Sequence, residues 1–299
     1  VSTVGVVPAN AAPKNQARSV AQPDWLEANL DNPKVRIIEV STEPGIYERG
    51  HIKNAIKFVW HTDLVDTVNR DIINAKNFSK LVQKAGISDD TTVVLYGDKN
   101  NWFAAWGAWI FNIYGQKDVR ILDGGRVKWE KDGRALTTAV PTFKAGNFNA
   151  NPADKNLRAN IIKDVIPAAK KTKVAALIDI RSADEFSGKI FAPAGFQELA
   201  VRAGHIPGAV NISWGQNVNA DGTFKTVAEL KKLYADKGID GKQNIITYCR
   251  IGERSSLTWF VLSEILGYNV KNYDGSWTEY GNSVGVPIVN NAGTIWGAA

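Results

Sequence analysis

The chain has 299 residues, of which 44% are hydrophobic and 22% are charged, and it contains 26 Gly, 11 Pro and a single Cys. These proportions are typical of a folded globular protein and exclude collagen-like, disordered and disulfide-framework classes. The length predicts two domains, because one core rarely keeps growing beyond about 250–300 residues. The net charge of +6 comes from basic and acidic residues that are interspersed along the chain. This pattern favours small anions and excludes a concentrated nucleic-acid-binding stripe.

The first 23 residues differ from the rest of the chain. Val1–Pro23 contains no acidic residue, and its run of Val4–Val7 followed by Ala9–Ala11 is similar to the end of an export signal with its cleavage site. A flexible tail is the other interpretation. Both interpretations stay open here, and with them an exported or periplasmic location against a cytoplasmic one. No apolar run reaches the ~20 residues of a membrane span.

Four short elements occur twice, in the same order and at a nearly constant spacing. The matched pairs are Val35–Val40 with Ala175–Ile180, Gly50–Ile52 with Gly204–Ile206, Thr92–Tyr96 with Asn244–Tyr248, and Val119–Gly124 with Val270–Gly275. Such a correspondence indicates a duplicated domain.

Strands and helices alternate in both repeats. Short β-branched runs predict strands, and apolar residues three or four positions apart predict helices. In chain order the expected elements are strand 35–40, helix 77–85, strand 92–96, helix 102–114, strand 119–124, strand 175–180, helix 227–237, strand 244–248, helix 257–266 and strand 270–275. The alternation predicts an α/β fold with two tandem domains, each a mainly parallel sheet flanked by helices.

The domain limits follow from composition. We expect a tail or signal remnant at 1–23, a first domain at 24–140, and a second domain at 161–290. A linker rich in Asn, Ala, Pro and Lys is expected at 141–160, and a second tail at 291–299.

The single cysteine stands at a position where parallel sheets bind ligands. Strand 244–248 runs directly into Cys249, which opens the sequence Cys-Arg-Ile-Gly-Glu-Arg-Ser-Ser before the expected helix. Free amide N–H groups, the helix N-terminus and two arginines are expected to lower the thiol pKa from about 8.5 into the ~3.5–7.5 range. We therefore interpret Cys249 as a nucleophile rather than as a small core residue. One thiol can form neither an internal disulfide nor a multi-cysteine metal site, and we expect no metal or cofactor.

The distance along the chain from Cys249 to Arg254 distinguishes two chemistries. Cysteine-dependent phosphatases separate their Cys and Arg by five residues, but here four residues separate them and Ser255 occupies the next position. The shorter loop suits a persulfide sulfur better than a phosphoryl group. A phosphatase, an arsenate-type reductase and a non-catalytic module that carries or binds sulfur stay open as alternatives.

The first repeat lacks these residues. Tyr96–Gly115 aligns with Tyr248–Gly267 without a gap. In that alignment the first repeat has Gly97 in place of Cys249, Asp98 in place of Arg250 and Trp102 in place of Arg254. Only the second repeat is therefore expected to be catalytic.

These motifs resemble the rhodanese superfamily, and in particular its tandem-domain thiosulfate sulfurtransferases. The resemblance covers about Pro23–Val289, and it rests on the loop Cys249–Arg254, on Asp179–Ser182 with Glu185–Phe186, on Gly204–Ala209 and on Tyr273–Trp277. It implies a catalytic C-terminal domain, a degenerate N-terminal domain and a substrate cleft between them. The basic residue Arg250 implies thiosulfate rather than mercaptopyruvate as the donor. Ile251 stands where relatives carry Lys, so the contribution of that charge is absent.

The resemblance also implies a double-displacement mechanism. Cys249 attacks the outer sulfur of thiosulfate, sulfite leaves, and the persulfide passes its sulfur to cyanide or to a thiol. We expect no nucleic-acid or membrane partner, and a monomer. Arg254 is expected to be a catalytic residue that orients the loop and offsets the persulfide charge. Arg181 and Arg250 are expected to bind the sulfonate, and Ile251 and Gly252 to donate inward-pointing amides. Glu253 is expected to be the partner of a loop arginine, and Trp277 to form part of the cleft wall.

Overall fold

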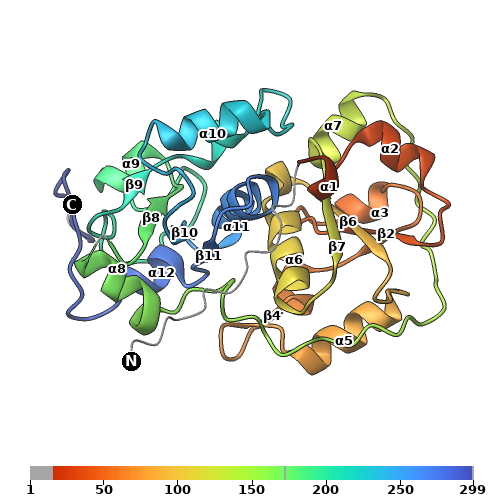
Figure 1. The fold of residues 1–299 in the computed structure, drawn as a ribbon, viewed down its shortest axis with the longest axis horizontal. Helices are drawn as coiled ribbons and strands as arrows, with labels where there is room; N and C mark the ends of the chain where they lie inside the picture. Colours follow the sequence, from red (N-terminus) through yellow and green to blue (C-terminus); the bar gives the residue numbers. More distant parts are fainter. Residues whose placement is uncertain (1–15, 172, 298–299) are drawn as a thin grey trace, which may run out of the picture.

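The structure is a computed structural model that describes residues 16–171 and 173–297. The segment on which the export-signal and tail predictions mainly fall, residues 1–15, lies outside the described residues. Two α/β domains lie next to each other (Figure 1). Both contain a parallel sheet flanked by helices, which confirms the predicted fold class.

The first domain is built on a five-stranded parallel sheet of order β1-β7-β6-β2-β3. Its strands are β1 (Val20–Ala21), β2 (Val35–Glu39), β3 (Ala55–Lys57), β6 (Thr92–Tyr96) and β7 (Asp118–Leu122), with a separate antiparallel pair β4 (Val65–Asp66) and β5 (Asp71–Ile72). Its helices are α1 (Gln16–Ser19), α2 (Pro23–Ala28), α3 (Ile46–Arg49), α4 (Trp60–Asp63), α5 (Ala75–Lys84), α6 (Trp102–Ile113) and α7 (Gly125–Lys131), with a 3₁₀ turn at Lys99–Asn101.

The second domain repeats this order with one strand fewer, as β11-β10-β8-β9. Its strands are β8 (Ala176–Asp179), β9 (Val210–Asn211), β10 (Ile245–Tyr248) and β11 (Val270–Asn272). Its helices are α8 (Ile166–Lys170), α9 (Ala183–Ser187), α10 (Val227–Ala235), α11 (Glu253–Trp259) and α12 (Ser276–Tyr280), with a 3₁₀ turn at Trp214–Asn217 and π-helical turns at Ile161–Val165 and Phe260–Ile265. Because β10 takes the central place that β6 takes in the first domain, the two sheets share one topology.

Both faces of the sheets are buried, which explains why their strands are apolar runs rather than alternating patterns. In β6, Val93 and Leu95 point into the core that contains α5 and α6. Val94 and Tyr96 point to the opposite core, beneath α2, α3 and α7. This is the two-residue period of a strand, with apolar side chains at every position.

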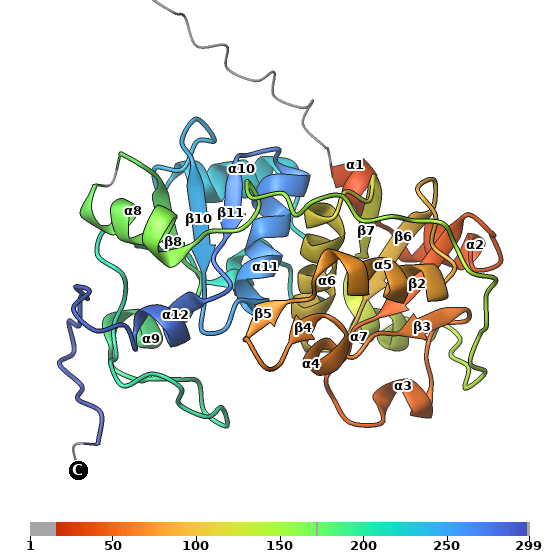
Figure 2. The same cartoon turned by 90° about the horizontal axis from the view of Figure 1, so that it is seen from below.

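The two domains share one continuous core. Helix α6 is apolar on all sides, because it packs on its own sheet and also against α11 of the other domain. The two helices lie side by side in Figures 1 and 2. Trp106 and Trp109 of α6 and Leu257 and Trp259 of α11 belong to the same cluster of buried residues. The half that contains Cys249 is therefore packed directly on the half that lacks a cysteine.

Among the differences between expected and observed boundaries, two change the description of the fold. The chain joins the first sheet at Val20, before the expected boundary at Pro23, because β1 pairs with β7. The helix expected over 257–266 begins at Glu253, since Gly252 adopts the left-handed conformation that starts it. Glu253 and Arg254 therefore lie in the first helical turn rather than in a loop, and only Cys249–Gly252 connects strand to helix.

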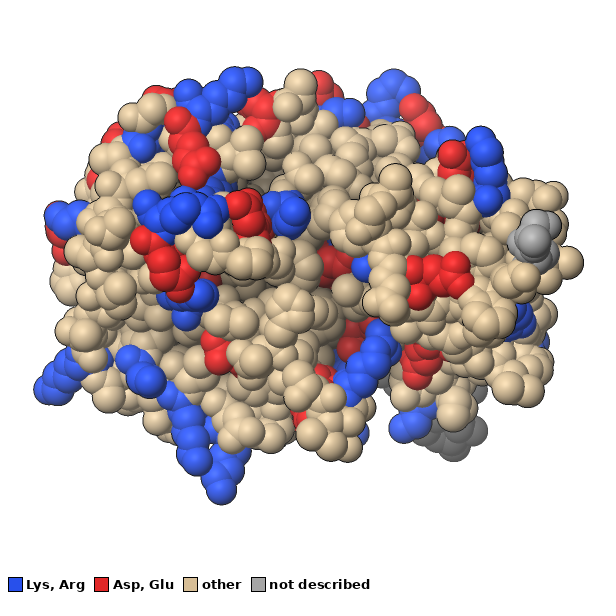
Figure 3. Space-filling view, turned by 180° about the vertical axis from the view of Figure 1, so that it is seen from behind, with Lys and Arg blue, Asp and Glu red and all other residues tan. Residues whose placement is uncertain are grey.

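The described surface carries charges of both signs. Figure 3 shows Lys and Arg side chains interspersed with Asp and Glu over one face. In the part of the chain that the structure describes, no helix has the length and apolar character to cross a membrane.

Candidate active site

Cys249 lies at the carboxyl end of β10, the central strand of the second sheet. Its side chain is fully buried. Its own backbone groups are held by α12, because its N–H donates to Ser276 Oγ at 3.1 Å and its carbonyl accepts from the N–H of Trp277 at 2.9 Å. The predicted position of the cysteine, between a strand end and a helix start, matches the structure.

Polar groups of the loop, of α11 and of α12 contact the sulfur, with Ser255 among them. The backbone N–H of Gly252 donates to Sγ at 3.0 Å, and the hydroxyl of Ser276 lies 4.0 Å from it. The carboxylate oxygen Oε2 of Glu253 accepts from the thiol at 3.8 Å. A backbone amide is thus placed to hold negative charge on sulfur, and a carboxyl group is placed to exchange a proton with it.

The prediction of a lowered thiol pKa is wrong. Burial, together with the negative charge of Glu253, raises the pKa of Cys249, although Arg254 acts in the opposite direction. Burial also raises the pKa of Glu253 itself. The sequence-based argument counted the charges of both loop arginines, but each guanidinium has a protein partner in the structure. The carboxyl group of Glu253 lies beside the Cys249 sulfur.

Arg254 is paired with a residue from a neighbouring strand end. Its Nη1 and Nη2 donate to Oε2 and Oε1 of Glu185 at 3.0 and 2.9 Å. Although burial opposes it, this pairing lowers the pKa of Glu185. The same carboxylate closes the capping box of α9 by accepting from the N–H of Ser182 at 3.1 Å. Arg254 is fixed in orientation by this arrangement, as bidentate pairs require.

Glu253 was expected to hold a loop arginine, and its contact with one is loose. Its Oε1 lies 3.8 Å from Nε of Arg254, without a direct hydrogen bond between the two. Glu185 does the holding instead. The side chain of Glu253 is turned towards the sulfur.

A pocket of about 370 Å³ opens beside this loop, between the two domains. The charged residues in its wall are Arg250, Arg254, Glu185 and Glu253. Trp102 of the first domain and Trp214 of the second meet edge to face in it, with ring centroids 4.9 Å apart. Ser182 and Ser213 also line it, and the rest of the wall comes from the irregular segment that follows α9 and includes Phe196. The pocket therefore combines two arginines and two carboxyl groups with an aromatic wall contributed by both domains.

Arg250 connects the loop to this irregular segment. Its Nη1 donates to the carbonyl of Gln197 at 2.8 Å, and its guanidinium lies 5.3 Å from the ring centroid of Phe196. The arginine lines the pocket, as its expected role requires. An anion that binds in the pocket would replace the Gln197 carbonyl as the hydrogen-bond acceptor of Arg250.

Arg181 and Trp277 are not brought to the pocket. The guanidinium of Arg181 is 1% exposed and is engaged with both carboxylate oxygens of Asp179 and with the carbonyl of Gly204. Trp277 is also 1% exposed, stacks near that guanidinium, and donates its indole N–H to the carbonyl of Arg202 at 2.8 Å. Because the guanidinium of Arg181 forms an ion pair with Asp179, we correct the expectation that it binds the sulfonate. We also correct the expectation that Trp277 forms part of the cleft wall. Both side chains pack behind the loop.

Ile251 lies at a second cavity of about 270 Å³ on another side of the loop, with Trp60 and Trp106 of the first domain among its lining residues. The same cavity is also lined by the charged side chains of Asp66, Arg70, Asp71 and Asp274, and Ile251 adds no charge to them.

The first domain could not accommodate a nucleophile at the equivalent position. A Cβ atom on Gly97 would lie 2.1 Å from the carbonyl oxygen of Val40, which excludes any side chain. Asp98, opposite Arg250, accepts from the backbone N–H groups of Thr42 and Glu43. The degeneracy of the first repeat is therefore built into its backbone.

Sequence reasoning missed three residues of the pocket. Glu185 was noticed only as part of a motif, and its position three residues after a helix-capping Ser182 was the signal that its carboxylate points back to the strand end. Trp214 and Phe196 carry no local signal, because the contacts that bring them to the pocket involve residues distant in the chain.

The comparisons with known proteins agree with this architecture. The model of the Rhodanese-like domain matches the chain twice, at residues 22–132 and 163–283. The chain belongs to the rhodanese family.

Similar proteins span nearly the whole chain. A Mycobacterium bovis protein named "Putative thiosulfate sulfurtransferase 1" is 54% identical over 267 residues, which cover 89% of this chain and 95% of that protein. The "Sulfur carrier protein TtuD" of Thermus thermophilus is 50% identical over 270 residues, covering 89% and 94%. Among solved structures, SseA of Escherichia coli, described as a 3-mercaptopyruvate sulfotransferase with the rhodanese fold, superposes with a TM-score of 0.73 at 27% identity, covering 86% of this chain and 98% of that one.

Proposed function

We propose that this protein is a thiosulfate sulfurtransferase that works through a persulfide on Cys249. The observation that carries the proposal is the contact of the Gly252 amide with Sγ at 3.0 Å, beside a pocket whose wall contains Arg250 and Arg254. A sulfur held by an amide next to two cations is suited to a reaction in which negative charge arrives with the donor and then stays on the sulfur. The names of the similar proteins support the same chemistry.

The proposed reaction has two displacements. The Cys249 sulfur attacks the outer sulfur of thiosulfate, the S–S bond of thiosulfate breaks, and sulfite leaves with the bonding electron pair. The thiol proton passes to Glu253, whose Oε2 lies 3.8 Å from Sγ. Cyanide or a thiol then attacks the outer sulfur of the persulfide and restores the cysteine. Arg250 would bind the sulfonate end in place of Arg181.

Thiocyanate formation from thiosulfate and cyanide tests this function. Wild-type protein should form thiocyanate and gain one sulfur atom at Cys249 when treated with thiosulfate, as measured by mass spectrometry. Cys249→Ser should reduce both to background, because the oxygen cannot carry the sulfur. An aryl phosphate serves as the parallel substrate. Wild-type protein that forms no thiocyanate, or a serine variant that forms as much, would contradict the proposal, and phosphate release would favour the phosphatase alternative.

Donor preference should depend on Arg250. We expect Arg250→Gly to lower kcat/KM for thiosulfate by about tenfold or more and to lower that for mercaptopyruvate less, since the dianion loses a charge-assisted hydrogen bond. Steady-state rates with each donor under identical conditions measure the difference. Arg70→Gly removes an arginine outside this pocket and is the matched control. Equal losses on both donors would remove the basis for assigning thiosulfate.

A further inference from the structure

The backbone of Gly252 lies between Trp106 of the first domain and the sulfur of Cys249. Its backbone N–H donates to Cys249 Sγ at 3.0 Å, and its φ is +103°. Its carbonyl is also fixed, accepting from the hydroxyls of Ser255 and Ser256 at 3.0 and 2.8 Å. The N–H lies in the peptide unit before the Gly252 Cα and the carbonyl in the unit after it, so the direction of the N–H depends on the backbone conformation of Gly252.

The space around Gly252 is closed on two sides. A Cβ atom at this position would lie 2.8 Å from Cζ3 of Trp106, 2.8 Å from Cα of Asp274 and 3.0 Å from Cβ of Asp274. Real Cβ atoms do not approach so closely, so Gly252 lies in contact with an indole on one side and a main chain on the other. Trp106 comes from α6 of the first domain, and Asp274 follows β11 of the second.

Trp106 is held within the first domain, and Asp274 is held by Arg158 of the linker segment. The Trp106 indole is 3% exposed and makes edge contacts with Trp60 and Trp109, at centroid distances of 5.5 and 5.1 Å. On the other side, Arg158 donates to both carboxylate oxygens of Asp274 at 2.8 and 2.9 Å.

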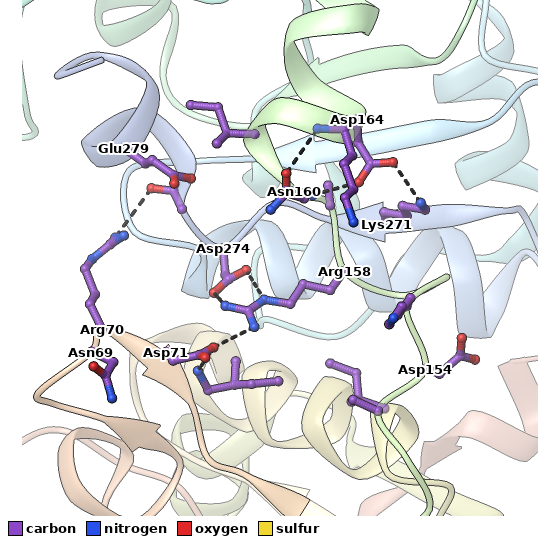
Figure 4. A pocket seen from close by; sticks show the side chains of 18 residues that line it. Asn69, Arg70, Asp71, Asp154, Arg158, Asn160, Asp164, Lys271, Asp274 and Glu279 are labelled. Carbon is purple, nitrogen blue, oxygen red and sulfur yellow. Dashed lines mark hydrogen bonds and ion pairs between the residues drawn. The ribbon is translucent and has the colours of Figure 1, made fainter. Parts of the chain in front are cut away.

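Arg158 also reaches across to the first domain. Its Nη1 donates to Asp71 of β5 at 2.6 Å. Figure 4 shows Arg158 between these two carboxylates, with Asp71 on the side of the first domain and Asp274 on the side of the second. The position of Asp274 is thus tied to β5 through one guanidinium.

From this geometry we propose that the first domain, although it lacks a nucleophile, positions the Gly252 amide on the reacting sulfur, with Trp106 and Arg158 as positioning residues. Trp106 contacts Gly252 directly. Arg158 acts on Gly252 through Asp274, whose carboxylate it binds. The proposal deepens the function proposed above, because it rests on Cys249 as the reacting group. It assigns a role in the reaction to the domain that carries no catalytic side chain.

The ionisation of Cys249 provides a readout that a merely structural role would not move. The charged groups facing the thiol are Glu253 and Arg254 of α11, with Glu185 of α9 behind Arg254. Substitutions at Trp106 and Arg158 leave all three in place. A thiolate that loses the Gly252 hydrogen bond is less stable, so its proton should leave at higher pH.

The experiment measures the rate at which iodoacetamide alkylates Cys249 across the pH range in the full-length chain, using mass spectrometry. The midpoint of the curve is compared, because absolute rates also respond to access. We expect Trp106→Ala and Arg158→Lys each to raise the midpoint, giving up to about tenfold less thiolate at a fixed pH below it. Arg158→Lys keeps the positive charge but loses the contact with both carboxylate oxygens of Asp274. Its midpoint can still be measured if Trp106→Ala does not fold.

Ser19→Ala is the matched control, because it removes a buried hydrogen bond to the carbonyl of Glu264 in the second domain without touching Gly252. Its midpoint should equal that of the wild type. Unchanged midpoints in both test variants, or an equal shift in Ser19→Ala, would overturn the proposal. Alkylation needs no sulfur donor, so a failure of thiosulfate turnover and a failure of this proposal give different results.

Discussion

Replacing Glu185 with alanine is expected to lower the free energy of unfolding by about 3–5 kcal/mol, because the Arg254 guanidinium would stay buried without its carboxylate partner. Arg254 is 5% exposed, and an arginine cannot escape the penalty by losing its proton. The same change removes the acceptor that closes the capping box of α9. Urea unfolding followed by circular dichroism measures the loss, and sulfur transfer should fall with it because Arg254 lines the pocket.

Glu229 is the matched control for this substitution. It occupies the equivalent third position of helix α10 and closes the same type of capping box with Thr226, but its carboxylate is on the surface and pairs with no arginine in the described structure. Glu229→Ala should therefore cause a much smaller loss of stability. Equal losses in the two variants would show that capping, rather than the buried pair, accounts for the effect of Glu185.

Gly252→Ala is expected to reduce the rate of persulfide formation by about 10²-fold, the magnitude found when one charge-stabilising donor is removed from an active site. The added Cβ would overlap with Trp106 and with the backbone of Asp274, so the peptide unit must move and carry its N–H away from Sγ. A positive φ adds strain for any side chain. Single-turnover release of sulfite from thiosulfate measures the rate.

Gly238→Ala separates strain from overlap. Gly238 also has a positive φ, +81°, but nothing lies within 4 Å of the position that its Cβ would take. We expect this variant to lose about 1 kcal/mol of stability and to keep its activity. If Gly252→Ala retains the wild-type rate, the amide contact is unimportant for the reaction. If both variants lose activity equally, backbone strain accounts for the result.

Local sequence patterns predicted the elements that carry the site. The strand at 92–96 was predicted with its observed limits, and the strand before Cys249 within one residue, because buried β-branched runs have one favourable conformation. The start of α11 was missed by four residues. Its cause is Gly252, whose left-handed conformation lets the helix begin at Glu253. Trp106 and Asp274, which leave no room for a side chain there, are distant from it in the chain.

The expectations about individual charges were less successful, for one physical reason. The sequence placed Arg181 at a strand end. It did not show that Asp179, two residues earlier, would form an ion pair with its guanidinium. The pKa of Cys249 was expected to fall because two arginines follow it, yet burial and Glu253 raise it. The effect of a charge depends on which partner it meets and on how much water it loses, and neither quantity is local in sequence.

The amino-acid sequence by itself determined that the protein consists of two copies of one α/β unit, that only the second copy has a thiol, and that this thiol follows a strand. These features follow from patterns that repeat or stand adjacent in the chain. Only the tertiary structure decided that Arg254 is held by Glu185, 69 residues away, and that Trp106 of the first domain lies against Gly252. Partners so distant in sequence are chosen by the packing of the two domains, because contact energies depend on distances in space.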